Sequence, residues 1–381
     1  MHDNPQIPYH QNRIPALDGL RGLAILLVIS FHYLPLTGKF NLGWSGVDLF
    51  FVLSGFLITG KLLDSIISPG YFSHFYRNRI LRIFPVYYLT LILFFTAVFF
   101  IAKNEHKQVL DSYREHWLSY FTFTENWTFI FFGLPKDKYL THFWTIAIEE
   151  QFYIVWPFLI YFFRNKKKLI RLLLAVISSV VLLRIFLFFQ NSSRSGSLAV
   201  IFNSFCRMDS FIMGALVSVT IRSGPMIPIQ RVRLILFTSF LLVVLGTLIV
   251  ANAKAVNPFF STVGFTLLAV FYACLLCLTL QTGNSPFIRF LTIPFLRFCG
   301  RISYGLYIFH WPILLILGTK LNNWGALQMP GHQFQVNLLT LLLCLLTTFM
   351  ISTVSFYYFE SYFLRLKKQV NSQPEILKHD H

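Results

Sequence analysis

The stretch Asp18-Gly-Leu-Arg21-Gly-Leu-Ala-Ile-Leu-Leu-Val-Ile-Ser-Phe-His32-Tyr33 decides the class of this protein. Its middle is almost entirely apolar, which predicts a membrane-spanning helix. Arg21 and His32 are eleven positions apart, so they return to within about 20° of one helix face, with a rise of about 16 Å. Asp18 falls about 40° from that face. Because ionisable side chains inside a span are costly, this stripe marks a candidate functional site. The alternative is that Arg21 anchors one membrane surface and His32 is a polar end at the other.

The composition extends this interpretation to the whole chain. Of 381 residues, 55% are hydrophobic and 12% are charged, and that charged share is half of the roughly 25% found in soluble domains. The 44 Phe and 17 Tyr residues suit lipid contact and membrane interfaces. A net charge of +17 would suit nucleic acid, but the basic residues lie in short clusters between apolar runs. We therefore expect an integral membrane protein with no nucleic-acid partner.

The apolar runs predict an all-α fold of about ten transmembrane helices. We expect these at about 17–35, 43–62, 84–102, 142–163, 169–189, 198–221, 232–251, 259–281, 300–318 and 337–358. The run 117–134 is short and contains Glu125 and Asn126, so we predict a re-entrant or surface-lying segment there. The connections between these spans are then alternately more and less basic. Because cytoplasmic connections carry the excess of Lys and Arg, this pattern predicts that both termini are in the cytoplasm. One membrane domain, 17–366, would lie between a polar tail at 1–16 and a cytoplasmic tail at 367–381.

Several ionisable groups lie within these runs, and together they predict a polar interior cavity. They are Asp48, Glu149, Glu150, Arg207, Asp209 and His310. A lone charge at mid-membrane costs roughly 2.5–3.5 kcal/mol on insertion scales, so internal pairing is expected. Glu149 and Glu150 point about 100° apart on a helix, so one could orient an imidazole while the other braces a neighbouring helix. The alternative is a structural pair satisfied by Arg207 or by hydroxyl groups.

Two further groups of residues have both a functional and a structural interpretation. Arg79 and Arg82 follow Arg77 in a basic segment, where they could clamp phosphate or simply anchor a helix near anionic lipid. His310 shares a helix face with Ser303 and Tyr307, an arrangement that a buried structural histidine would also produce.

In this order, five motifs resemble the acyltransferase-3 family of integral membrane O-acyltransferases, which modify cell-surface glycans. The motifs are Arg21-x10-His32, Gly46-Val-Asp48-Leu-Phe-Phe-Val-Leu-Ser54-Gly55-Phe, Arg79-Ile-Leu-Arg82-Ile-Phe-Pro85, Phe143-Trp144-Thr-Ile-Ala-Ile-Glu149-Glu150-Gln151-Phe-Tyr153 and Ser303-Tyr304-Gly-Leu-Tyr307-Ile-Phe-His310. The resemblance covers about 14–366. Thr145-Ile-Ala-Ile departs from the family's Ser-Leu-Ser-Val-like run. We expect a stand-alone form without the hydrolase-like extracytoplasmic domain that is fused to some members.

The resemblance implies transfer of an acyl group, usually acetyl, from cytoplasmic acyl-CoA to a hydroxyl of a cell-surface or exported glycan. The placement of Arg21 on the inner side and His32 on the outer side agrees with this: Arg21 could hold the phosphates of the donor, helped by Arg79 and Arg82, and His32 could be the general base. Glu149 and Glu150 are further candidate catalytic residues, Glu149 by orienting the imidazole. Candidate substrate-binding or charge-stabilising residues are Asp48, Trp144, Arg207, Asp209 and His310.

We expect a bacterial inner-membrane location, no metal and no permanently bound cofactor. Expected partners are acyl-CoA, a glycan or lipid-linked saccharide acceptor and membrane lipid, and an envelope-assembly protein is left open. Three alternatives remain: a transporter or flippase of glycan precursors that uses the same charges, a non-catalytic partner of a glycan assembly complex, and an O-acyltransferase of another class built on His310.

Overall fold

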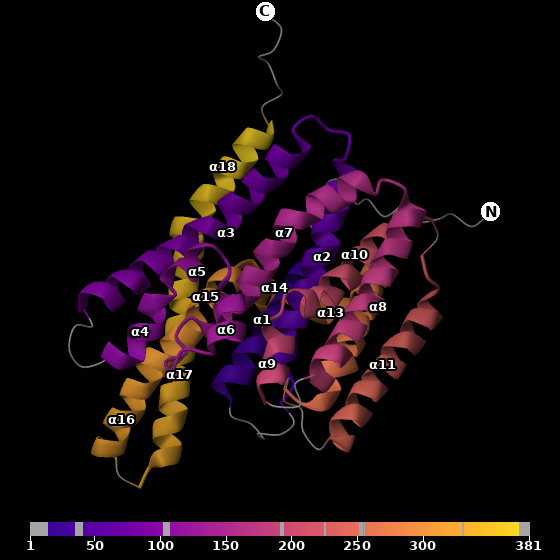
Figure 1. Cartoon of the computed structure of the whole chain (residues 1–381). Coiled ribbons are helices and arrows are strands. Elements are labelled where there is room, and N and C mark those ends of the chain that lie inside the picture. The colour runs from indigo at the N-terminus through magenta and orange to yellow at the C-terminus, as the bar shows by residue number, and fades with distance from the viewer. Residues whose placement is uncertain are drawn as a thin grey trace, which may run out of the picture.

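The computed structural model describes residues 14–34, 41–101, 107–190, 194–224, 226–250, 254, 256–329 and 331–372. These residues form helices and contain no strand, which confirms the predicted all-α membrane fold (Figure 1). The longer helices are α1 (Pro15–Tyr33), α2 (Gly46–Asp64), α3 (Tyr71–Thr96), α7 (Trp144–Phe162), α8 (Lys166–Gln190), α10 (Met208–Ile221), α11 (Ile229–Ile249), α12 (Phe265–Gln281), α15 (Ser303–Ile313) and α17 (Gln333–Val354). The shorter ones are α4 (Lys107–Glu115), α5 (Trp117–Phe121), α6 (Glu125–Phe132), α9 (Arg194–Phe202), α13 (Pro286–Leu291), α14 (Pro294–Arg301), α16 (Thr319–Gln328) and α18 (Ser361–Ser372).

Within the described residues, eight helical stretches are long and apolar enough to cross a membrane. They are Pro15–Tyr33, Gly43–Asp64, Tyr71–Phe99, Lys166–Gln190, Ile229–Ile249, Phe260–Gln281, Ser303–Gln328 and Gln333–Leu366. They coincide with eight of the ten predicted spans. The other two coincide with α7, whose Glu149-Glu150-Gln151 run lowers its hydropathy, and with α9 and α10. The chain leaves the α-helix between α9 and α10, so only 14 residues remain in α10.

Two helices extend beyond positions at which the sequence suggested a boundary. The basic segment does not precede a separate third span, since α3 runs through Pro85 and continues as a π-helical turn, Ala97–Ile101. Arg79 and Arg82 therefore belong to the spanning helix itself. The predicted start of the C-terminal tail at 367 falls inside α18.

The run 117–134 forms two short helices, α5 and α6, in agreement with the prediction that it does not span. Glu125 and Asn126 are fully buried, whereas Phe131 and Phe132 are exposed. The Nε2 of Gln151 donates to Asn126 Oδ1 at 2.9 Å, and this bond fastens α6 to α7. The polar residues that interrupt the run thus face the protein.

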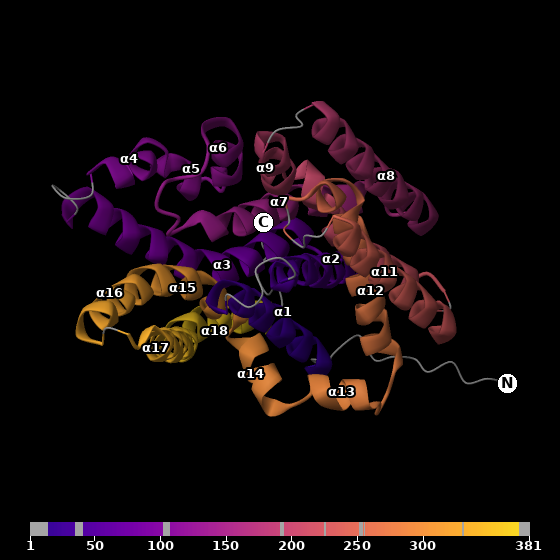
Figure 2. The same ribbon diagram turned by 90° about the horizontal axis from the view of Figure 1, so that it is seen from below.

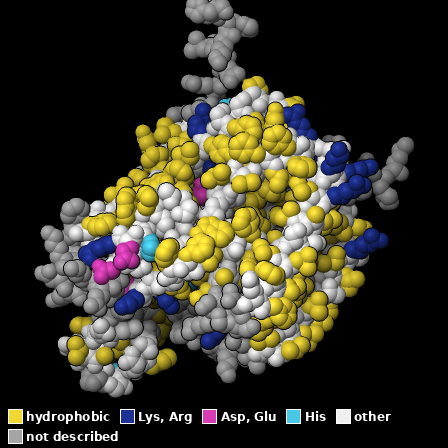
Figure 3. Space-filling model, in the orientation of Figure 1, with side chains coloured by type: hydrophobic (Ala, Val, Ile, Leu, Met, Phe, Trp, Pro, Cys, Tyr) yellow, Lys and Arg dark blue, Asp and Glu magenta, His cyan; other side chains and the backbone are white. Residues whose placement is uncertain are grey.

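Helices α1 and α2 lie in the middle of the bundle. Helices α3, α15 and α17 lie on one side of them and α8, α11 and α12 on the other (Figure 2). The most apolar windows of the α1 and α2 spans are 61% and 67% buried, whereas those of α8 and α11 are each 22% buried. The outer helices expose apolar side chains over much of the visible surface, as lipid contact requires (Figure 3).

Close packing of α2 against α10 depends on glycine. A Cβ on Gly55 would lie 1.9 Å from the carbonyl oxygen of Phe211, and one on Gly214 would lie 1.9 Å from that of Val52. Membrane helices approach this closely only where residues are small. The contact brings Asp48, near the start of α2, against Arg207, which immediately precedes α10.

Basic residues gather at one end of the bundle, visible at the upper right of Figure 3. There Lys166, at the start of α8, donates to the backbone carbonyl of Arg222, and Arg222 pairs with Asp64 at 2.8 Å. The positive-inside rule predicts that this end is cytoplasmic. We call it the inner end.

Candidate active site

Three adjoining cavities run through the bundle from Arg21 to His32. The inner cavity has a volume of about 620 Å³, the middle cavity about 340 Å³ and the outer cavity about 180 Å³. The inner and middle cavities share Arg21, Arg82 and Tyr304 in their linings. The middle and outer cavities share Val47, Thr145 and Tyr307. The predicted stripe on α1 therefore lines all three cavities in turn.

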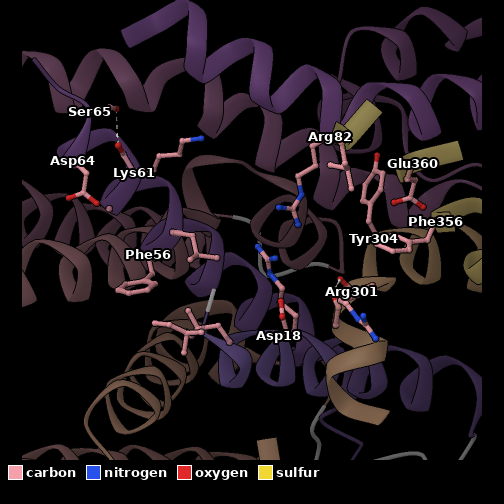
Figure 4. A pocket seen from close by; sticks show the side chains of 18 of the residues that line it. Asp18, Phe56, Lys61, Asp64, Ser65, Arg82, Arg301, Tyr304, Phe356 and Glu360 are labelled. Carbon is pink, nitrogen blue, oxygen red and sulfur yellow. Dashed lines mark hydrogen bonds between the residues drawn. The ribbon is translucent and has the colours of Figure 1, made fainter. Parts of the chain in front are cut away.

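The inner cavity is rich in cations. Arg21, Lys61, Arg82 and Arg301 line it, and Figure 4 shows Lys61 and Arg82 extending toward its middle from α2 and α3. Among the described residues, Arg21, Lys61 and Arg82 form no ion pair, whereas the neighbouring Arg222 is held by Asp64. Guanidinium and ammonium groups of this kind suit phosphate. Sequence reasoning missed Lys61 and Arg301, because a cation at a helix end resembles a membrane anchor.

The middle cavity contains Arg79 and Glu149. The Arg79 guanidinium lies 5.5 Å from the centre of the Tyr153 ring. One oxygen of Glu149 accepts hydrogen bonds from Ser54 Oγ and from the Tyr153 hydroxyl. The structure does not bring Glu149 to His32, because Glu149 is more than one helical turn past Trp144 and Thr145, the α7 residues that line the outer cavity. The expected orientation of the imidazole by Glu149 therefore finds no geometric support.

Glu150 lies on another face of α7. It is 6% exposed, it lines none of the three cavities, and its Oε1 has no hydrogen-bond partner among the described residues. The expected catalytic role of Glu150 is likewise without support from the geometry. The roughly 100° between adjacent helical residues separates it from Glu149.

The outer cavity is built from histidine and aromatic rings. His32 lies at its edge, and its ring centre is 4.4 Å from that of Trp311 and 5.0 Å from that of His310. Trp144 lines the same cavity, as does His142, whose ring centre is 5.3 Å from that of His310. Sequence reasoning did not select His142. Its position just before α7 was the available signal, because that places it at the same depth as Trp144.

Two buried ion pairs flank this region, and only one of them reaches a cavity. Arg207 donates to Asp48 at 2.7 Å, its guanidinium lies 3.7 Å from the Phe265 ring centre, and it lines the outer cavity. Asp209 instead pairs with Arg184 at 2.7 Å, away from all three cavities. The internal pairing that was expected of these charges is thus present for Arg207 and Asp48, whereas Asp209 contacts a residue that the sequence did not single out.

The described ranges contain no group of three or more His, Cys, Asp or Glu side chains arranged to hold a metal ion. The three cavities are lined by Arg21, Lys61, Arg82 and Arg301 at the inner end and by His32, His142 and aromatic rings at the outer end. Together they define an integral membrane protein with a series of adjoining internal cavities.

Comparison with known proteins places this architecture in a family. Residues 14–358 match the family model described as an acyltransferase domain. The chain is 28% identical over 351 residues to the peptidoglycan O-acetyltransferase OatA of Listeria monocytogenes, covering 86% of this chain and 54% of that protein. It is 31% identical over 343 residues to the putative peptidoglycan O-acetyltransferase YrhL of Bacillus subtilis, covering 83% and 51% respectively. No solved structure matches.

The chain belongs to the acyltransferase-3 family of integral membrane acyltransferases. It spans about half the length of the curated relatives that it matches.

Proposed function

We propose that this protein transfers an acyl group, in the first instance acetyl, from acyl-CoA at the inner cavity to a hydroxyl of a cell-wall glycan at the outer cavity. The observation that carries the proposal is the series of three cavities between Arg21 and His32. The peptidoglycan named in the descriptions of two relatives supports the acceptor class. A bacterial inner membrane, with the inner end toward the cytoplasm, is the corresponding location.

The inner end would bind the donor. Arg21, Lys61 and Arg82 are cations with no ion-pair partner among the described residues, and they surround the largest of the three cavities. They would hold the phosphates of acyl-CoA, with Arg79 beside the path that the pantetheine arm follows through the middle cavity.

The outer end would carry the chemistry. His32 takes the proton of the acceptor hydroxyl while the hydroxyl oxygen attacks the thioester carbonyl. The tetrahedral oxyanion then collapses, the carbon–sulfur bond breaks, and the CoA thiolate leaves and recovers the proton from the imidazolium. Arg207 is the candidate oxyanion donor, because its Nε and one terminal nitrogen are buried with no hydrogen-bond partner among the described residues.

The test uses the purified protein in lipid vesicles. Radiolabelled acetyl-CoA and a lipid-linked glycan precursor are supplied, and label in the glycan is followed for wild type, His32→Ala and Arg21→Ala. His332→Ala is the control, because His332 is exposed and lines none of the cavities described above. We expect label transfer by wild type and the control, and loss in the other two variants.

Two results would contradict the proposal. Transfer that survives in His32→Ala would remove the proposed base. Movement of unmodified glycan across the vesicle membrane without any acyl donor would favour the transporter alternative.

A further inference from the structure

We infer that His310 holds His32 in one tautomer and so aims the basic nitrogen of His32 at the outer cavity. This inference rests on the proposed function, because it gives His310 a part in the same transfer. It replaces the expected role of His310 in contacting substrate. His310 is fully buried and is absent from the linings of the three cavities.

The first step concerns the proton on His310. Its Nδ1 lies 2.8 Å from the carbonyl oxygen of Tyr307 and 3.2 Å from that of Leu306. Carbonyl oxygens accept hydrogen bonds and cannot donate them, so the Nδ1 of His310 carries a hydrogen. In the neutral ring the Nε2 of His310 is then an acceptor.

The second step concerns His32. Its Nδ1 lies 3.1 Å from the carbonyl oxygen of Val28 and 3.2 Å from the Nε2 of His310. Both of these atoms are acceptors, so the Nδ1 of His32 carries a hydrogen that the two of them share. The lone pair of neutral His32 is therefore on Nε2, which has no hydrogen-bond partner among the described residues. Because His32 lines the outer cavity, this lone pair is available to an acceptor hydroxyl.

Only one other neutral arrangement keeps a hydrogen bond between the two rings, and it is unfavourable. A hydrogen on the Nε2 of each ring would turn the Nδ1 lone pair of His310 toward two carbonyl oxygens and that of His32 toward a third. A doubly protonated His310 would keep its own Nδ1 hydrogen, but the Nδ1 lone pair of His32 would still face the carbonyl oxygen of Val28, and an uncompensated charge would lie in a fully buried site. The arrangement with a hydrogen on both Nδ1 atoms satisfies every contact.

A hydrogen bond between the Tyr33 side chain and the backbone of His310 holds the two histidine rings in register. Tyr33 follows His32 in α1, and its hydroxyl donates to the carbonyl oxygen of His310 at 2.8 Å. The same hydroxyl lies 2.8 Å from Thr348 Oγ1 in α17, which then donates to it. Neighbouring residues of α1 thus contact both the ring and the carbonyl of His310. This makes His310 a positioning residue for the base.

Replacement of His310, whose Nε2 accepts the hydrogen bond from His32, gives the first test. Transfer is measured in the vesicle assay described above. Loss of one hydrogen bond to an essential group predicts that His310→Ala lowers kcat by about ten- to a hundredfold with the KM for acetyl-CoA unchanged. In His310→Gln the amide oxygen stands near the position of Nε2, so we expect most of the rate to return. In His310→Asn the shorter amide stays near Nδ1, so we expect no recovery.

Nitrogen-15 spectra of histidine in the full-length protein give a second test that does not depend on activity. Signals are assigned by comparing His32→Ala and His310→Ala with wild type. We expect both rings to carry hydrogen on Nδ1, and we expect His32 to lose this preference in His310→Ala.

Several outcomes would overturn the inference. They are a wild-type His32 with hydrogen on Nε2, a His310→Gln variant no more active than His310→Asn, or full activity of His310→Ala while His32→Ala is inactive. If wild type transfers no label but both rings carry hydrogen on Nδ1, the tautomer assignment stands and the proposed function fails instead.

Discussion

The inner and outer cavities differ in how they hold charge. In the inner cavity Arg21, Lys61 and Arg82 have no ion-pair partner among the described residues. In the outer cavity the buried Arg207 is paired with Asp48, and Lys138, His32 and His142 also line it. Unpaired cations suit the binding of a polyanionic donor, whereas a neutral imidazole suits proton transfer near neutral pH. Under the proposed function, donor binding and chemistry would therefore be separated along one helix, α1.

The largest effect is expected from a substitution at the outer cavity. His32→Ala should lower the transfer rate by roughly 10²–10⁴-fold, because it removes a general base. The KM for acetyl-CoA should stay the same, since the donor's phosphates would bind at the other end. Vesicle assays at several donor concentrations check this, and a raised KM with an unchanged rate would reverse the roles of the two ends.

The second prediction concerns the buried ion pair Arg184–Asp209, which lines none of the three cavities. Arg184→Met or Asp209→Asn alone should destabilise the protein by about 3–5 kcal/mol, because each leaves a buried polar or charged group unpaired. The combined Arg184→Met/Asp209→Leu variant should recover much of that loss. Thermal unfolding in detergent measures the change. Single variants as stable as wild type would show that the pair is not needed for the fold.

The third prediction concerns the inner end. Arg82→Gln removes one charged contact to the donor, so we expect the KM for acetyl-CoA to rise by about tenfold or more, with little change in kcat. Arg231→Gln is the matched control, because this arginine is exposed on α11 and lines none of the cavities described here. A fall in kcat alone would place Arg82 with the chemistry.

The smallest effect is expected from a substitution of Tyr307, between the middle and outer cavities. Tyr307 separates the middle and outer cavities, and its hydroxyl bonds Thr145 Oγ1 at 2.5 Å and the carbonyl oxygen of His142 at 2.9 Å. Loss of these bonds in Tyr307→Phe should change the transfer rate only a few-fold, as expected for about 1 kcal/mol. Activity as low as that of His32→Ala would instead assign the Tyr307 hydroxyl to the reaction.

Much of this protein could be predicted from its sequence. The apolar runs predicted the all-α membrane fold, and their lengths located eight spans. The eleven-residue spacing of Arg21 and His32 predicted a stripe on one helix, and that stripe lines all three cavities. These features depend on composition and on the period of a single helix, which the sequence contains directly.

What the sequence could not supply was the choice of neighbours between helices. Glu149 meets Ser54 and Tyr153 rather than His32, and Asp209 meets Arg184. His32 and His310 are 278 positions apart, yet their nitrogen atoms lie 3.2 Å from each other. Helical periodicity determines which face a residue occupies, but the helix opposite that face is determined by packing, such as the contact between α2 and α10 at Gly55 and Gly214. The chemistry-bearing residues were therefore visible in the sequence, whereas their partners were decided only by the tertiary structure.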